Sequence, residues 1–110
     1  MAYDEQLASR LRELLAAEPG LAEKKMFGGL AFLIGGHLAV AASGQGGLLL
    51  RVDPARSEEL TAGGEATVAV MRGRAMPGWL RIESARVADD AGLRRWVELG
   101  AGYARTLPPK

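Results

Sequence analysis

Leucines near the start of the chain repeat at helical spacing. Leu7, Leu11 and Leu14 are three or four residues apart, with charged residues between them. This pattern predicts an amphipathic helix over 3–17 with one apolar face. The Pro19-Gly20 pair then ends it, because proline cannot continue the helical hydrogen bonds and glycine favours turns.

The pattern changes after Met26 to short apolar runs separated by glycines. We predict strands over 30–34, 37–42 and 48–52. Gly35-Gly36 suits a type I′ hairpin turn, which needs a positive φ at both central positions. The three strands are therefore expected to form an antiparallel meander.

The second half of the chain predicts a helix, two strands and a final helix. Asp53, followed by proline, is typical of a helix start, so a helix is expected over 54–60. Strands follow over 67–71 and 79–83. Apolar residues at three- and four-residue steps predict the last helix, over 89–107. The fold class expected from this order is α+β, with an antiparallel five-stranded sheet packed with helices.

Length and composition favour one globular domain over residues 1–110. The chain is 48% hydrophobic and 25% charged and contains no cysteine, which excludes disulfides, thiolate metal sites and a cysteine nucleophile. The net charge of +1 is too small to indicate nucleic-acid binding by itself. The start of the chain lacks a signal-peptide pattern, and no apolar run approaches the ~20 residues of a membrane span. We expect a cytoplasmic protein that does not contact membranes.

Candidate catalytic groups are few. His37 is the only histidine, and without cysteine it cannot form a usual transition-metal site, so we interpret it as a surface residue. The serines have no nucleophile-elbow context. The glycine-rich run over 43–47 lacks the ending of a phosphate-binding loop and predicts a hairpin turn. We therefore expect no enzyme, cofactor or metal, because a hydrolase or transferase needs an acid–base pair that we cannot name here.

Two glycine-containing runs, over 24–29 and 71–79, place cations beside large apolar side chains. Arginine binds phosphate or carboxylate through paired hydrogen bonds, and glycine lets the backbone approach closely. Arginines in two predicted strands could extend such a patch across one sheet face. The alternative is a solvated loop beside methionines and aromatics that fill the core. The candidate ligand- or partner-binding residues are Met26, Phe27, Arg51, Arg72, Gly73, Arg74, Trp79 and Arg81.

The order of elements and several short motifs resemble the N-terminal domain of the TfoX/Sxy family of bacterial competence regulators. The resemblance covers nearly the whole chain. The motifs are Lys25-Met26-Phe27-Gly28-Gly29, Ile34-Gly35-Gly36-His37, Leu50-Arg51-Val52-Asp53, and Met71-Arg72-Gly73-Arg74-Ala75-Met76 followed by Gly78-Trp79. The resemblance implies an α+β domain similar to type III secretion chaperones in its order of elements, and it implies no catalytic residues.

The resemblance also implies a regulatory role. Full-length members of the family carry a second, C-terminal domain that looks like a helical nucleic-acid-binding domain, and they act as positive regulators of DNA-uptake genes. The sequence ends at Lys110 without such a domain, so we expect a stand-alone N-terminal-type domain.

The first hypothesis is a non-enzymatic regulatory or adaptor module that binds a protein or other acidic partner in transcription or competence control. The alternative is a small anionic-ligand or nucleotide-binding domain, with Met26, Phe27 and Trp79 forming an apolar pocket. The sequence alone does not decide whether the protein contacts DNA directly.

The predicted strands are apolar at successive positions and do not alternate with polar residues. Such strands are typical of sheets that are covered on both faces. Three helices can supply part of that cover, and a second copy of the chain could supply the rest. We therefore expect a homodimer.

Overall fold

The computed structural model describes residues 3–26 and 28–110. In this part of the chain, six strands form one antiparallel sheet with the order β1-β2-β3-β4-β6-β5. The strands are β1 (Leu21–Met26), β2 (Gly29–Ile34), β3 (His37–Ala42), β4 (Leu48–Arg51), β5 (Thr67–Met71) and β6 (Arg74–Ile82). The helices are α1 (Glu5–Leu15), α2 (Ser57–Thr61) and α3 (Asp90–Thr106), with 3₁₀ turns η1 (Pro54–Arg56) and η2 (Ser84–Val87).

The predicted α+β class, the antiparallel sheet and the three helices are confirmed, but the prediction of five strands was wrong. The missed strand is β1, an edge strand whose four middle residues are exposed. Charged residues on an edge discourage pairing with other chains, and they also remove the apolar alternation by which a strand is recognised. Strand β6 begins earlier than predicted, at Arg74, so the arginine-glycine connection is only a tight turn.

Two local predictions are confirmed in detail. Ile34 pairs with His37, and the two intervening glycines, Gly35 and Gly36, have φ values of +60° and +88°, as a type I′ turn requires. The carboxylate of Asp53 accepts a hydrogen bond from the Ala55 amide at 3.0 Å and so caps the following turn. The predicted helix over 54–60 is in fact η1 followed directly by α2.

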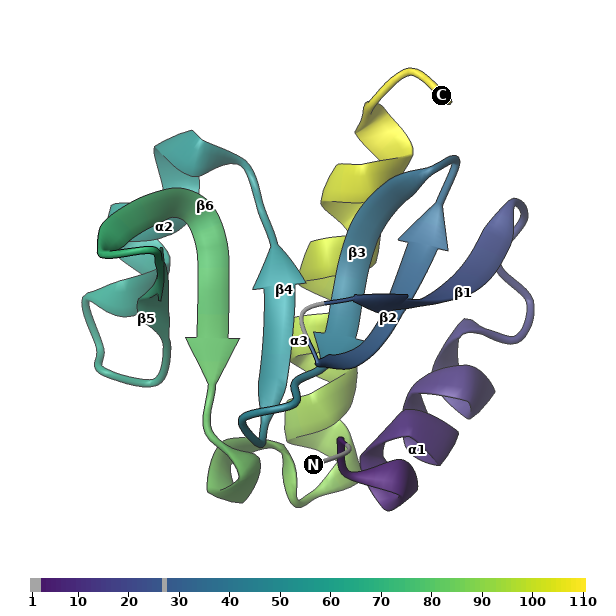
Figure 1. Cartoon of the computed structure of the whole chain (residues 1–110), viewed down its shortest axis with the longest axis horizontal. Coiled ribbons are helices and arrows are strands. Elements are labelled where there is room, and N and C mark those ends of the chain that lie inside the picture. Colours follow the sequence, from purple (N-terminus) through teal and green to yellow (C-terminus); the bar gives the residue numbers. More distant parts are fainter. Residues whose placement is uncertain (1–2, 27) are drawn as a thin grey trace.

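Helices α1 and α3 cover one face of the sheet, and α3 passes behind β3 and β4 in Figure 1. The main core lies between them, with Leu11, Phe32 and Trp96 at most 2% exposed. Gly100 allows the closest approach of α3 to the sheet, since a Cβ there would lie 2.4 Å from the Ala39 carbonyl oxygen. Burial of large apolar side chains at this interface is the main source of stability.

The opposite face of the sheet, which we call the helix-free face, carries a second buried cluster without any helical residue. Side chains alternate between the two faces along β4, where Leu48 and Leu50 join the main core and Leu49 joins the second cluster. The residues of the second cluster, each at most 4% exposed, are Ala31, Leu38, Ala41, Leu49 and Ala69. The apolar strands are thus buried on both faces, as their sequences predict.

Curvature of the sheet covers this second cluster. Strands β1 and β6 bend away from the direction of the central strands (Figure 1). Met26 at the end of β1 and Met71 at the end of β5 both pack on the cluster, although these are the two edge strands. Both methionines also line one small pocket on this face. In a flat sheet with about 4.8 Å between strands, the first and last of six strands would lie about 24 Å apart. The two edges therefore approach each other over the helix-free face.

Because this cover comes from the same chain, burial of the second cluster does not by itself require a second copy. The homodimer stays a prediction. The apolar strands do not support it, because they are already covered within one chain.

Replacement of Gly100 by alanine tests the contact between α3 and β3. The new methyl group would clash with backbone, so Gly100→Ala should lower the free energy of unfolding by about 1–3 kcal/mol, as overpacking typically does. The matched control is Gly102→Ala on the same helix, where nothing lies within 4 Å of the new Cβ. That change should stabilise by up to about 1 kcal/mol through helix propensity. Urea unfolding measures both, and equal effects would contradict this packing.

Candidate anion-binding pocket

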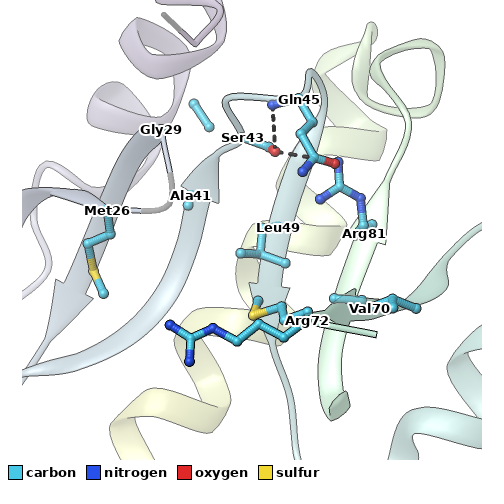
Figure 2. Close-up of a pocket in the computed structure, with 12 residues that line it drawn as sticks. Met26, Gly29, Ala41, Ser43, Gln45, Leu49, Val70, Arg72 and Arg81 are labelled. Carbon is cyan, nitrogen blue, oxygen red and sulfur yellow. Dashed lines mark hydrogen bonds between the residues drawn. The ribbon is translucent and has the colours of Figure 1, made fainter. Parts of the chain in front are cut away.

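A pocket of about 240 Å³ opens on the helix-free face. Its floor is apolar and consists of Ala41 from β3, Leu49 from β4 and Ala69 from β5. Met26 borders one side, and Figure 2 shows it on the β1 side of the pocket, across from Val70. The pocket therefore exists because the two sheet edges approach each other.

Two arginines reach the pocket from opposite ends of β5. Arg81 pairs with Thr67, the first residue of β5, whereas Arg72 directly follows the last residue of that strand. Figure 2 shows Arg81 beside Ser43 and Gln45, and Arg72 on the other side of Leu49. The pocket thus has a cationic group at each end and an apolar middle.

The Arg81 end also carries neutral polar groups. Ser43 is 8% exposed, and its hydroxyl oxygen accepts a hydrogen bond from the Gln45 amide at 3.1 Å. Nη2 of Arg81 lies 3.5 Å from the same oxygen, at the outer limit of a hydrogen bond. The guanidinium group therefore keeps most of its donors available for a ligand.

The pocket lining contains no carboxylate to neutralise these arginines. Within the described residues, Arg72, Arg74 and Arg81 have no aspartate or glutamate at ion-pair distance. Five other arginines do have such partners: Arg10 with Asp90, Arg12 with Glu23, Arg56 with Glu59, Arg95 with Glu65, and Arg105 with Glu18 and Glu98. Among the described residues, Arg51, Arg86 and Arg94 also lack such a partner, so Arg72 and Arg81 differ from them in that both line the pocket.

Those ion pairs also show what a carboxylate beside an arginine does in this protein. Hydrogen bonds from Arg105 and Arg12 lower the pKa of Glu18 and Glu23, respectively, below the usual range of a glutamate. An incoming carboxylate at the pocket would meet the same kind of guanidinium donor and would likewise be held in its charged form.

Arg72 has an unusual backbone conformation. Its φ of +53° makes it the one non-glycine residue with positive φ among residues 3–26 and 28–110. With Gly73 at +77°, it forms a two-residue turn between the paired Met71 and Arg74, as in a type I′ hairpin. A side chain there costs roughly 1–2 kcal/mol relative to glycine. Such a cost at a pocket edge points to a role for this side chain beyond folding.

Three of the eight candidate residues line the pocket, namely Met26, Arg72 and Arg81. Gly73 forms the turn, and Arg74 is exposed outside the lining. Phe27 lies outside the described residues. The candidate binding residues therefore stay a prediction, and only part of them lie together in this pocket.

Arg51 and Trp79 belong to a separate contact. The guanidinium carbon of Arg51 lies 5.4 Å from the ring centre of Trp79 and 5.8 Å from that of Tyr103 on α3. These are cation–π distances, and the contact links β4 and its neighbour β6 to the helix. Trp79 lies outside the pocket lining, but it packs on the same second cluster as Met26, so the predicted apolar pocket of Met26, Phe27 and Trp79 stays a prediction.

Sequence reasoning missed Ser43 and Gln45, which lie in the glycine-rich turn between β3 and β4. The hairpin interpretation of this turn is confirmed, because the Ser43 amide donates to the Gly47 carbonyl at 3.0 Å. In the structure, Gly29 and Gly44 lie close together, so the β1–β2 turn packs against this turn. A Cβ on Gly44 would lie 2.3 Å from the Gly28 carbonyl oxygen.

His37 is far from the pocket lining and contacts the end of the chain. Its Nε2 lies 2.6 Å from the Pro108 carbonyl oxygen, to which it must donate. In the described part of the chain, no group of three histidine, aspartate or glutamate side chains could hold a metal ion. None of the helices described here has the length and apolar character needed to cross a membrane.

The fold and the pocket together define a small α+β domain with a curved antiparallel sheet and a cationic pocket on its helix-free face. The model of the TfoX N-terminal domain matches residues 13–104, so the chain belongs to that family. No curated protein and no solved structure matches the chain. The expected similarity to type III secretion chaperones therefore stays a prediction.

The conformation of Arg72 leads to a stability prediction. Arg72→Asn converts the turn to the asparagine–glycine pair that type I′ hairpins favour, so it should raise the free energy of unfolding by up to about 1 kcal/mol. For a domain of this size, that corresponds to a rise in melting temperature of roughly 4 °C. Differential scanning calorimetry measures it. A clear fall in melting temperature would show that the side chain of Arg72 contributes to folding.

Proposed function

We propose that the protein is a non-enzymatic, cytoplasmic regulatory or adaptor module that binds an acidic partner at the helix-free face. Membership of the TfoX N-terminal domain family supports the regulatory part of this proposal. The observation that carries the binding part is the lining of the pocket, which contains two guanidinium groups and no carboxylate. An anionic group of a partner would supply the missing charge at both arginines.

The polar groups of the pocket support binding more than catalysis. Its lining offers the side chains of Ser43, Gln45, Arg72 and Arg81, and none of these is a usual general base. The single histidine is held at the other end of β3 by Pro108. Arginine beside serine and amide groups is instead a typical set for carboxylate or phosphate recognition.

The second candidate is a domain that binds a small anionic ligand. The pocket volume supports a small anion and disfavours a nucleotide, because 240 Å³ lies below the roughly 300–1,000 Å³ of usual ligand pockets. The same volume suits one acidic side chain of a protein partner. The two candidates therefore share one anion-binding site.

A binding measurement with matched variants tests the proposal. A short fluorescein-labelled peptide of alternating glutamate and alanine should bind the wild-type protein and be released by salt, because its contacts are ionic. The double variant Arg72→Gln/Arg81→Gln should bind at least about tenfold more weakly, since charge-assisted hydrogen bonds are lost. Fluorescence anisotropy across a salt series measures this.

The control is Arg86→Gln/Arg94→Gln, which removes the same charge from two exposed arginines outside the pocket. It should leave peptide binding unchanged. Equal weakening by both double variants would contradict the proposal, because binding would then follow only the net charge. Labelled duplex DNA in the same series tests DNA as the anionic partner. If DNA binding is lost in the pocket variant and kept in the control, the proposed partner becomes DNA and is no longer an acidic protein.

A further inference from the structure

The pocket has a positive charge at each end and an apolar region between them, and this arrangement indicates which class of anion fits it. We propose that the pocket binds a short aliphatic dicarboxylate, with one carboxylate at Arg81 and Ser43 and the other at Arg72. This inference rests on the proposed anion-binding role of the pocket and names the chemistry that the pocket recognises.

The two cations enter the pocket from its two ends. Arg81 lies opposite Thr67, and Arg72 is five residues further along the chain, which corresponds to at most about 16 Å of strand. The side chains enter the pocket from these two ends, and Figure 2 shows Leu49 and Ala41 in the region between them. A single carboxylate would satisfy one arginine and leave the other without a partner.

The region between the charges is apolar. Ala41, Leu49 and Ala69 form the floor, and Met26 and Met71 are the adjoining apolar side chains. Methylene groups of a ligand would be removed from water there, whereas a polar spacer would lose its hydrogen bonds. The spacer should therefore be a hydrocarbon chain.

The volume limits the length of this spacer. A pocket of about 240 Å³ is small for a ligand site, so it suits a short chain of methylene groups between the two arginines. Glutarate, adipate and pimelate each place such a short chain between two carboxylates.

Calorimetric titration tests this inference with free small molecules. The ligands are glutarate, adipate and pimelate, and the controls are pentanoate, hexanoate and heptanoate, which have the same numbers of carbons and one carboxylate fewer. At physiological ionic strength, the best dicarboxylate should bind the wild-type protein at least about tenfold more tightly than the matching monocarboxylate. Equal affinity for the two classes, or no saturable binding of any dicarboxylate, would overturn the inference.

Single variants test both ends of the site separately. In Arg72→Gln or Arg81→Gln, the preference for the dicarboxylate over the monocarboxylate should disappear, whereas Arg94→Gln on α3 should keep it. A preference that persists in either pocket variant would overturn the assignment of two ends. Arg72→Gln leaves Arg81 in place, so each ligand should still bind weakly through one carboxylate. This remaining binding shows that the variant is folded.

The outcomes also separate this inference from the proposed function. If the acidic peptide binds through the two arginines and no dicarboxylate binds, the adaptor function stands and the dicarboxylate inference fails. If neither probe binds in an arginine-dependent way, both fail. A peptide that ends in glutamate and competes with adipate would show that a protein terminus can present the same two carboxylates.

Discussion

Curvature of the six-stranded sheet is the constraint on which the pocket depends. Met26 from one edge strand and Met71 from the other line the same pocket, although in a flat sheet the two edges would lie about 24 Å apart. Close backbone contacts at Gly29 and Gly44 place the β1–β2 turn against the β3–β4 turn, since a Cβ at either position would meet a carbonyl oxygen. The same curvature buries the small residues of the helix-free face and leaves a hollow above them.

The arginines divide into groups with different physical roles. Arg105 and Arg12 form ion pairs between different segments of the chain, and exposed pairs of this kind contribute little to stability. Arg51 lies against two aromatic rings and joins the sheet to α3. Arg72 and Arg81 have neither kind of partner in the described residues, and they differ from the other such arginines in that they line the pocket above its apolar floor.

Local features of the fold could be predicted from the sequence, whereas features set by distant contacts could not. The Gly35-Gly36 turn and the Asp53 cap depend on neighbouring residues, and both are confirmed. Strand β1 was missed because its exposed charges carry no periodic signal. The sequence grouped Arg72 and Arg81 with Trp79 as candidate residues, because only the three-dimensional register shows that the two arginines line the pocket and that Trp79 lies against Arg51.

Amide chemical-shift mapping would test the central claim that the helix-free face binds anions through these two arginines. Titration of the ¹⁵N-labelled protein with the unlabelled glutamate–alanine peptide should shift amides around Ser43, Ala69, Arg72 and Arg81, which surround one pocket although they are distant in sequence. Shifts confined to the exposed arginines of η2 and α3, or spread evenly over the basic surface, would contradict the account.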